Sequence, residues 1–314
     1  MKQFKQDVFN GLSASPKQLP SKYFYNEIGD ALFVQIMQMP EYYLTRSEQE
    51  IFTMKASEIV HSLHRDKNSH FELVELGAGD GTKTIEILRE LIDQDYHFSY
   101  LPVDISENAL DGIQSMLNSE LPELVVSKKQ GDYFGVLASL QESNYPKVVF
   151  FLGSNLGNMP DERATEFMTK LSATLSPNDR VLLGVDLIKA KEIVLPAYDD
   201  SQGITRDFNL NLLQRINDEL GGDFKLEQFE HVAEYEETEG IAKSYLKSNV
   251  NQIVTISSLN QSFTFEEDEC IHTEISRKYN DDVLAKILEK SNLEVQTKFM
   301  DSAYLFADYI LIRK

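Results

Sequence analysis

The chain has 314 residues, of which 42% are hydrophobic and 26% are charged, a composition typical of a globular protein that buries a substantial core. Its formal net charge of −21 argues against a nucleic-acid partner, because phosphate binding requires a basic face that the sequence nowhere concentrates. We therefore expect a small-molecule ligand.

Cysteine content and hydropathy exclude further classes of protein. The single cysteine, Cys270, cannot form an internal disulfide, and no Cys/His cluster has zinc spacing, so we expect a reducing compartment and no metal. The first residues lack the apolar core of a signal peptide, and no stretch approaches the ~20 apolar residues that a membrane span needs. The sequence predicts a cytoplasmic, monomeric protein that does not bind membranes.

The amino-terminal region is predicted to begin extended and then to become helical. Residues 1 to about 20 are polar and contain two X-Pro dipeptides, which favour an extended lead-in over a helix. A short helix at residues 31–37 is bracketed by four tyrosines, which suit either aromatic packing or a polar pocket. Ser47 and Glu50 have capping-box spacing, which predicts that the next helix begins at Ser47.

A glycine-rich turn follows at a strand-to-helix junction. Residues 71–76 form an apolar run typical of a buried strand, and apolar residues recur at helical spacing over residues 85–92. Between them, Gly77, Gly79 and Gly81 allow backbone conformations closed to other residues. They also let a ligand approach the unpaired N–H groups at the start of the helix. The pattern therefore indicates a nucleotide-like ligand.

The glycine spacing narrows the class of ligand. Gly77-x-Gly79-x-Gly81 is tighter than the GxGxxG motif of dinucleotide-binding proteins. Together with the leading acidic residue Glu75, it resembles motif I of class I S-adenosylmethionine (SAM) methyltransferases, whose ligand carries no pyrophosphate. A short glycine motif is weak by itself, so another nucleotide and a packing turn without a ligand remain alternatives.

Strand and helix patterns alternate from about residue 72 to residue 189, which predicts parallel β-α-β units and a doubly wound α/β sheet. After the first strand, four more are predicted at residues 98–104, 124–127, 147–152 and 180–188. Ligands bind at the carboxyl ends of the strands in such sheets. Polar residues at those ends are therefore candidates for the binding site.

Polar residues do follow these strands. Asp104 ends the second strand and suits hydrogen bonds to the ribose hydroxyls of a nucleoside, although it could instead cap the next helix. Asp132 follows the third strand and can accept from an adenine amino group beside the ring of Tyr133. The fourth strand runs into a loop at residues 153–158. We expect these positions and Gly77 to converge on one edge of the sheet.

The pattern changes beyond residue 189. A helix is predicted at residues 205–220, then antiparallel strands up to residue 265, and a closing hairpin near the carboxyl end. We therefore predict a nucleotide-binding domain and a second, smaller α+β domain that acts as a lid or binds the substrate. The predicted boundaries are residues 47–188 plus 279–314 for the first domain and residues 1–46 plus 189–278 for the second.

Seven motifs are spread over nearly the whole chain, at residues 22–26, 40–46, 75–84, 102–106, 151–158, 197–211 and 273–279. As an ordered set they resemble the amino-acid N-methyltransferases typified by histidine-specific N-alpha-methyltransferase, which makes trimethylhistidine (hercynine) on the way to ergothioneine. The resemblance implies a Rossmann-like class I SAM methyltransferase sheet with a second α+β substrate domain.

The resemblance also implies two sets of binding residues. The SAM site would be formed by Tyr42, Gly77, Gly79, Lys83, Asp104, Asp132 and Tyr133. For an amino-acid substrate, Asn158 and Tyr198 would bind the α-carboxylate. Tyr25, Gly153 and Asn155 would lie near the amine, where Tyr25 and Asn155 are candidates for orienting it during catalysis. Glu274 and Ser276 would bind the imidazole.

The proposed imidazole contacts have a physical basis. Glu274 and Ser276 are two residues apart on a predicted strand and share one face, so both can reach the two nitrogens of one ring. The alternative for Glu274 is a solvated carboxylate paired with Lys278 or Arg277. We favour L-histidine as the substrate.

Three positions depart from the family pattern. Leu44 replaces a proline, Asn155 stands where histidine enzymes usually have threonine next to the amine, and Ser244 stands where a methionine is expected in the substrate pocket. The pocket could therefore fit a different ring, and family members acting on indole-bearing amino acids are known.

The predicted activity is stepwise trimethylation of an amino acid. Because a free α-amino group has a pKa near ~8, positioning should matter more than a strong base. Alternatives are the same chemistry on another aromatic amino acid or related amine, and a SAM-binding regulatory module without turnover. A NAD-dependent dehydrogenase is disfavoured by the glycine spacing and by the absence of a hydride-transfer dyad.

Overall fold

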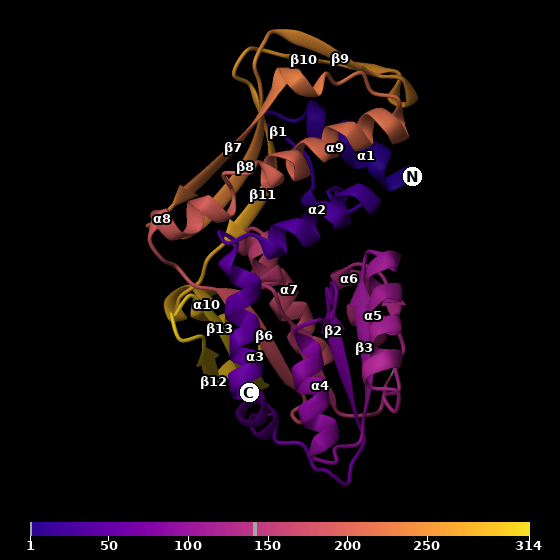
Figure 1. Ribbon diagram of the computed structural model, residues 1–314, viewed down its shortest axis with the longest axis vertical. Coiled ribbons are helices and arrows are strands. Elements are labelled where there is room, and N and C mark those ends of the chain that lie inside the picture. Colours follow the sequence, from indigo (N-terminus) through magenta and orange to yellow (C-terminus); the bar gives the residue numbers. More distant parts are fainter. Residues whose placement is uncertain (1, 141–142) are drawn as a thin grey trace. The chain divides into compact units, whose positions relative to one another are not determined.

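A computed structural model describes residues 2–140 and 143–314 of the chain (Figure 1). The chain divides into two compact units. Unit 1 comprises Met1–Tyr43 and Lys189–Ser276, and unit 2 comprises Leu44–Ile188 and Arg277–Lys314. Among the described helices, none combines the length and apolarity needed to cross a membrane.

Unit 2 is built on a seven-stranded sheet. The strand order is β12 (Leu293–Met300), β13 (Phe306–Arg313), β6 (Arg180–Asp186), β5 (Lys147–Phe151), β2 (Phe71–Leu76), β3 (Phe98–Asp104) and β4 (Lys129–Gln130). β2 pairs in parallel with both β3 and β5, whereas β13 is antiparallel to β6 and β12. The chain order reverses beside β2, which is where open α/β sheets bind ligands.

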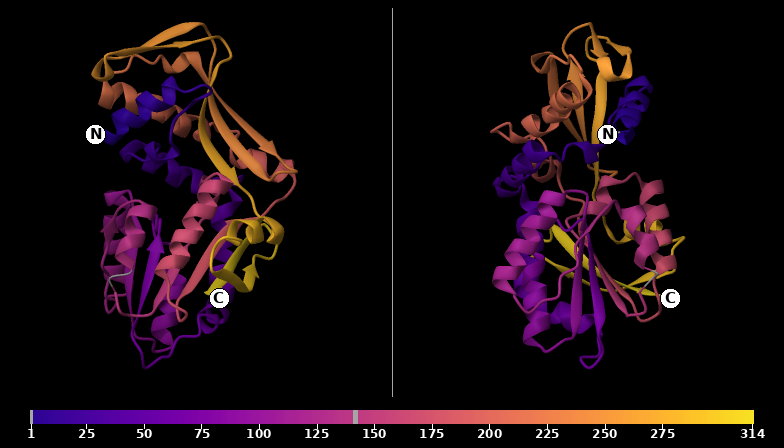
Figure 2. Two further views of the ribbon diagram at one scale, coloured as in Figure 1. Left: turned by 180° about the vertical axis from the view of Figure 1, so that it is seen from behind. Right: turned by 90° about the vertical axis from the view of Figure 1, so that its right-hand side faces the viewer.

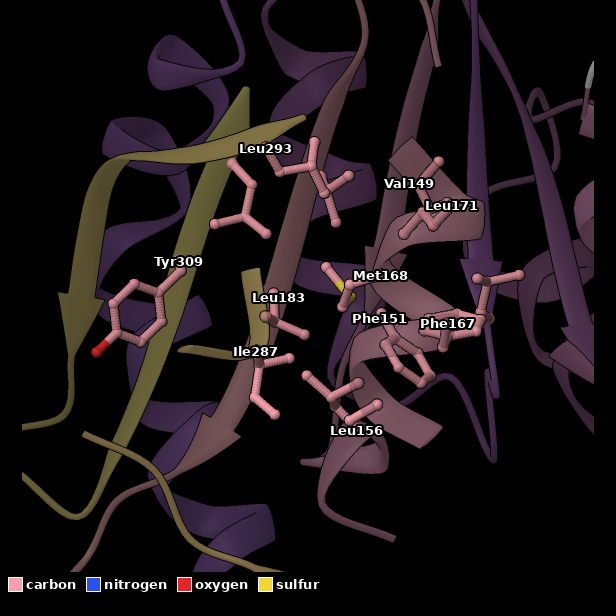
Figure 3. Close-up of a cluster of buried hydrophobic side chains, with 14 of the residues drawn as sticks. Val149, Phe151, Leu156, Phe167, Met168, Leu171, Leu183, Ile287, Leu293 and Tyr309 are labelled. Atoms are coloured by element: carbon pink, nitrogen blue, oxygen red, sulfur yellow. The ribbon is translucent and has the colours of Figure 1, made fainter. Parts of the chain in front are cut away.

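Helices cover both faces of this sheet, because alternate strand residues point to opposite sides (Figure 2, right). Leu73 packs with α3 (Tyr43–Ser62), α4 (Thr84–Asp93) and α5 (Glu107–Glu120). Its neighbour Val74 packs with α6 (Tyr133–Leu140), α7 (Asp161–Thr174) and α10 (Asp281–Leu288). Figure 3 shows part of this second cluster, including Phe151, Phe167 and Leu183. The predicted doubly wound sheet is confirmed.

Unit 1 contains a four-stranded sheet in the order β1 (Lys17–Gln18), β11 (Cys270–Arg277), β8 (Ile241–Ser248) and β7 (Phe229–Glu236). β9 (Gln252–Ile256) and β10 (Gln261–Phe265) form a separate antiparallel pair. The helices are α1 (Lys2–Ser13), α2 (Glu27–Gln38), α8 (Lys191–Val194) and α9 (Ile204–Leu220). Residues of α9 such as Phe208, Leu212 and Ile216 belong to the apolar core of this unit. The predicted helix at residues 205–220 is therefore confirmed.

Short 3-10 turns complete the chain at Ser21–Tyr23, Asn155–Asn158, Leu195–Ala197, Leu226–Gln228 and Ser257–Leu259. The chain leaves unit 2 after Ile188 and returns at Arg277. Within unit 2 these two segments are joined by hydrogen bonds from Tyr279 N to Asp186 O and from Ile188 N to Tyr279 O, both 2.8 Å. Lys278 and Asp186 form a completely buried ion pair at 2.7 Å.

Two sequence predictions about the amino-terminal region are wrong. Residues 2–13 are helical rather than extended, because Phe4, Val8 and Leu12 recur every four residues and bury one helix face in the core. The helix α3 begins at Tyr43, so Ser47 lies inside it rather than at its cap. Glu50 accepts a hydrogen bond from Ser302 N at 2.8 Å and does not act in a capping box with Ser47.

The prediction of a strand at residues 124–127 is also wrong. Only an isolated bridge joins Val126 to Tyr100, and β4 begins at Lys129. Edge positions offer a partner on one side alone, so β-branched residues there do not secure a regular ladder.

Candidate functional site

The glycine-rich loop after β2 has a backbone that other residues cannot adopt without strain. Gly77, Gly79 and Gly81 have φ angles of +75°, +57° and +70°. Space is also limited at Gly77, where a Cβ atom would lie 2.6 Å from Asn155 Nδ2 and 2.7 Å from the Tyr133 hydroxyl. At Gly79, by contrast, a Cβ atom would meet nothing within 4 Å. Strain and severe crowding therefore combine at Gly77 but not at Gly79.

Asp104 lies against this loop. Its Oδ2 accepts a hydrogen bond from Gly79 N at 3.0 Å, and its Oδ1 accepts one from Ser106 N at 2.9 Å. The cap of α5 is Ser106, whose hydroxyl accepts from Ala109 N at 3.2 Å. Asp104 is thus a carboxylate held beside the glycine turn rather than the helix cap, and its ribose-binding role stays a prediction.

Asp132 and Tyr133 occupy the next strand end. Asp132 Oδ1 accepts from Gly135 N at 2.9 Å in the first turn of α6. The Tyr133 ring packs edge-on against Phe151, with ring centroids 5.0 Å apart, while its hydroxyl faces Gly77. Burial, followed by the charge of Asp104, raises the pKa of Tyr133 above its usual value, so this hydroxyl stays neutral.

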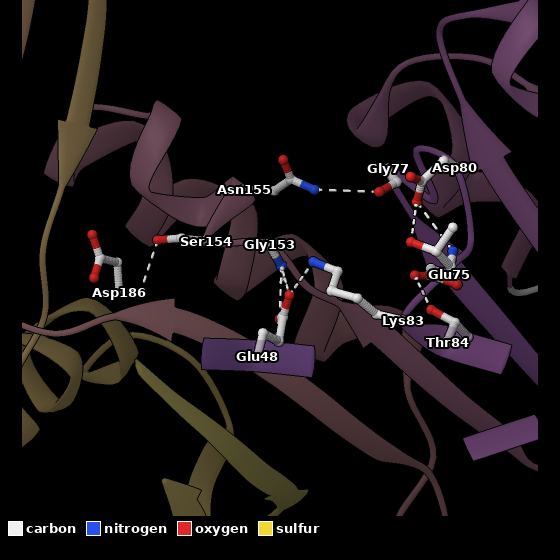
Figure 4. Close-up of polar contacts among 11 residues, drawn as sticks. Glu48, Glu75, Gly77, Asp80, Lys83, Thr84, Gly153, Ser154, Asn155 and Asp186 are labelled. Carbon is white, nitrogen blue, oxygen red and sulfur yellow. Dashed lines mark hydrogen bonds and ion pairs between the residues drawn. The ribbon is translucent and has the colours of Figure 1, made fainter. Parts of the chain in front are cut away.

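The loop after β5 forms the opposite side of the site. Gly153 and Ser154 both have positive φ angles, +67° and +58°. The Ser154 hydroxyl accepts from Asp186 N at 3.1 Å and so fixes the loop to β6. Asn155 Nδ2 donates to Gly77 O at 3.4 Å, which links this loop to the glycine-rich loop (Figure 4). Asn158 ends the 3-10 turn of this loop.

Charged side chains lie behind both loops. Glu48 of α3 accepts a hydrogen bond from Gly153 N and forms an ion pair with Lys83 (Figure 4). Burial disfavours the charged form of Lys83, but Glu48 and then Glu75 reverse this effect and raise the pKa of its ammonium group. Glu75 accepts from Thr84 Oγ1 at 2.7 Å and from the Tyr100 hydroxyl. Its burial raises the pKa of Glu75 to about 7.

The expected convergence in unit 2 is confirmed. Contacts join the glycine loop to Asp104, Tyr133 and Asn155, and a Cβ at Gly153 would lie 3.7 Å from Lys83 Nζ. Glycine backbone, one carboxylate and one partly buried aromatic ring are the kinds of group that recognise a nucleoside. In the described part of the chain, no group of three or more His, Cys, Asp or Glu side chains could hold a metal ion. Sequence reasoning missed Glu48, which no motif distinguishes from other helical glutamates.

A separate polar group of unit 1 comprises side chains on β8 and β11 and Tyr198, which follows the 3-10 turn Leu195–Ala197. The hydroxyl of Tyr198 donates to Ser276 Oγ at 2.7 Å, and Ser244 Oγ donates to Glu274 Oε2 at 3.2 Å. Ser244 is completely buried (0% exposed). Glu274 thus has a buried hydroxyl as a neighbour, an environment that differs from the solvated carboxylate considered as the alternative.

The two cations considered as partners of Glu274 have other carboxylates beside them. Arg277 Nε lies 3.1 Å from Asp161, and Lys278 pairs with Asp186. Both of these pairs belong to unit 2. They anchor the segment that follows β11.

Tyr25 and Tyr42 lie in unit 1 and share an aromatic neighbour. Phe33 packs edge-on against both rings, with centroids 5.6 Å from Tyr25 and 6.4 Å from Tyr42. Tyr25 also packs against Phe208 of α9. The aromatic packing considered for this tyrosine cluster is therefore present, and the roles predicted for the two phenols stay predictions.

Comparisons with known proteins cover both units. The family model described as "Histidine-specific methyltransferase, SAM-dependent" matches residues 4–313. A protein named "Histidine N-alpha-methyltransferase" from Mycolicibacterium smegmatis is 35% identical over 91% of this chain and 87% of its own length. One of the same name from Mycobacterium tuberculosis is 32% identical over 92% and 88%. A more distant relative from Psilocybe serbica, "L-tryptophan methyltransferase trpM", is 23% identical over 97% and 90%.

Proposed function

Because the chain belongs to the family of histidine-specific, SAM-dependent methyltransferases, we propose that it methylates the α-amino group of L-histidine to give N,N,N-trimethylhistidine. SAM is the cofactor of this enzyme. The observation that carries the choice of substrate is the pairing of Glu274 with Ser244 on the neighbouring strands β11 and β8, together with the hydrogen bond from Tyr198 to Ser276 of β11.

Residues of unit 2 fit the cofactor. Gly77 lets the Asn155 amide and the Tyr133 hydroxyl approach its backbone, Asp104 offers a carboxylate beside the glycine backbone, and Tyr133 contributes a neutral, partly buried ring. When bound, SAM supplies an electrophilic methyl group on a sulfonium. Gly77, Gly79, Lys83, Asp104, Asp132 and Tyr133 are the residues that would hold it, and the contact proposed for Tyr42 stays a prediction.

The protein residues need only to align the amine, because the methyl transfer requires no strong base. An ammonium group must lose a proton before its nitrogen can attack, and a free α-amino group with a pKa near ~8 is already partly neutral at neutral pH. No strong base is therefore needed, and alignment of the amine provides most of the acceleration. Each methyl added releases one proton to water. Tyr25 and Asn155 are proposed to orient the amine, and Asn158 and Tyr198 to bind the α-carboxylate.

We assign recognition of the imidazole to unit 1. The Glu274 carboxylate can accept from one ring N–H, and the hydroxyl of Ser276 can donate to or accept from the other nitrogen. Ser244 orients Glu274 through its hydrogen bond at 3.2 Å. A ring that lacks two polar nitrogens would leave part of this polar group unpaired, which costs binding energy.

A second candidate substrate is another aromatic amino acid. Ser244, which stands where a methionine is expected, favours this alternative because serine takes up less volume than methionine. The same polar group argues for histidine, since indole offers only one N–H donor.

Isothermal titration calorimetry decides between the substrates. The protein is titrated with L-histidine, N,N-dimethylhistidine and L-tryptophan in the presence of S-adenosylhomocysteine (SAH), and mass spectrometry counts the methyl groups transferred. We expect both histidine forms to bind and to reach the trimethylated product. Methylation of L-tryptophan with no binding of histidine would support the second candidate, whereas a product that stops at one methyl group would refute stepwise trimethylation.

Location and assembly also belong to the proposal. We propose a cytoplasmic enzyme that acts as a monomer, and sedimentation analysis of the purified protein tests the monomer directly.

A further inference from the structure

Two buried carboxyls that no sequence motif predicted lie behind the cofactor loops. Glu48 on α3 and Asp308 on β13 are both completely buried (0% exposed). A Cβ at Gly184 of β6 would lie 2.2 Å from Glu48 Oε1 and 2.9 Å from Asp308 Oδ1. The two carboxyls therefore both lie against Gly184, and any side chain at this position would clash with them.

The two carboxyls have different hydrogen-bond partners. Glu48 accepts from Gly153 N at 2.8 and 3.1 Å through its two oxygens and is paired with Lys83 (Figure 4). Neither oxygen of Asp308 has a hydrogen-bond partner within the described residues. Burying an ionised carboxylate without donors is costly, so the negative charge is favoured on Glu48.

Charge balance leads to the same assignment. The ammonium of Lys83 compensates one carboxylate, and a second buried anion beside it would have no counter-charge. Neighbouring carboxyls in such a site hold one proton between them. Burial and then the charge of Glu48 raise the pKa of Asp308 well above its usual value, against the opposing effect of Lys83. Glu75 is the remaining acid near Lys83.

We propose that Glu48 and Asp308 act as a carboxyl pair with one proton that positions the SAM site: Glu48 is the anion that holds Lys83 and Gly153, and Asp308 is the neutral acid. Lys83 lies in the loop after β2 and Gly153 in the loop after β5, so Glu48 joins the ends of two neighbouring parallel strands. An ionised Asp308 would compete for the ammonium and loosen that link. Both are positioning residues.

Binding of SAH to the full-length protein at pH 7 tests the pair. Asp308→Asn mimics the neutral acid and should bind SAH within about twofold of the unsubstituted protein. Glu48→Gln retains an oxygen for Gly153 N but removes the charge that holds Lys83, so the dissociation constant should rise more than about tenfold, equivalent to more than about 1.4 kcal/mol. Glu58→Gln, on an exposed part of the same helix, is the matched control and should bind normally.

Infrared spectroscopy supplies a readout that a purely structural role would not change. A protonated carboxylic acid has a C=O stretching band that a carboxylate lacks, and Asp308→Asn should remove one such band at pH 7. Comparison of the two proteins cancels the contribution of Glu75. Circular dichroism and thermal unfolding check that each variant is folded. If Glu48→Gln does not fold, the infrared band and the SAH affinity of Asp308→Asn together test whether Asp308 is the neutral acid.

The proposal stands only if Asp308→Asn retains SAH binding and loses the acid band. An unchanged band, or a loss of affinity in Asp308→Asn comparable with that in Glu48→Gln, would overturn it by showing that Asp308 is ionised. Because the ligand is SAH alone, the outcome does not depend on which amino acid is methylated.

Discussion

The polar site of unit 2 is formed mainly by backbone groups, whereas that of unit 1 is formed by side chains. In unit 2 the candidate cofactor site consists mainly of backbone, with positive-φ glycines at Gly77 and Gly153 and buried charges behind them. In unit 1 the polar group consists of side chains on or beside β8 and β11, namely Tyr198, Ser244, Glu274 and Ser276 together with their hydrogen bonds. Backbone geometry tolerates few substitutions, whereas side chains on a regular strand can be exchanged without moving the strand. We therefore expect cofactor binding to be rigidly specified and substrate choice to be adjustable.

The largest expected effect is at Gly77. Gly77→Ala should abolish measurable SAH binding, because the added Cβ would lie 2.6 Å from Asn155 and 2.7 Å from Tyr133 in a backbone conformation with φ of +75°. Calorimetric titration with SAH measures the loss. Gly79→Ala is the matched control, since it adds the same methyl group at φ of +57° with nothing within 4 Å. It should cost only backbone strain of about 1–2 kcal/mol. Equal losses in both variants would show that crowding at Gly77 is unimportant.

The next effect concerns the stability of unit 2. The pKa of Glu75 is raised by burial from its ordinary value of 4.5 to about 7, so the folded state binds this proton more tightly than the unfolded state. Stability from this group is complete below pH 4.5 and falls as the pH rises through 7. Glu75→Gln should remove this dependence of stability on pH. From low pH to pH 8, the free energy of unfolding of the variant should therefore gain about 3 kcal/mol relative to that of the unsubstituted protein.

Urea denaturation at about pH 5 and about pH 8 measures this difference. At the lower pH the free energies of unfolding of the two proteins should differ by little more than the baseline cost of the substitution. A difference that does not change between the two pH values would contradict the raised pKa of Glu75.

Glu274 should affect the substrate alone. Glu274→Ala removes the carboxylate proposed to bind the imidazole, so the dissociation constant of L-histidine should rise about 100-fold, equivalent to about 2.7 kcal/mol. SAH binding should stay within about twofold, because Glu274 is not among the residues proposed to hold the cofactor. Glu234→Ala, on strand β7 of the same sheet, is a control for changing sheet charge. Retained histidine binding in Glu274→Ala would remove the imidazole role from this residue.

The smallest effect is a change of preference at Ser244. Ser244→Met removes the hydroxyl that donates to Glu274 and fills space at a completely buried position. We expect the selectivity between L-histidine and L-tryptophan, measured as the ratio of kcat/KM values, to shift about tenfold toward histidine because the larger indole loses room. Ser244→Ala separates the two causes, since it removes the hydroxyl without adding volume. A shift toward tryptophan in Ser244→Met would show that the hydrogen bond matters more than the space.

Sequence reasoning succeeded where a local pattern carries the information. The apolar runs of β2, β3, β5 and β6 and the glycines after β2 identified the doubly wound sheet and the edge at which Asp104 and Asn155 gather. The local pattern does not settle helix α1, because Phe4, Val8 and Leu12 have helical spacing whereas Pro16 and Pro20 favour an extended chain; burial of one helix face in the core selects the helix. The capping-box spacing of Ser47 and Glu50 gives the wrong start for α3, because Glu50 accepts its hydrogen bond from Ser302, far away in the sequence.

The order of its motifs and the periodicity of its strands let the sequence by itself determine the family, the fold class and the cofactor-binding edge. These features depend on residues that are close together along the chain. Only the tertiary structure decided that Glu48, Lys83 and Asp308 share one buried region near Gly184. Their positions in the chain lie far apart, and a lone glutamate or aspartate has no periodicity to reveal that it is buried. The charge of such a group depends on its neighbours in space, which local sequence does not specify.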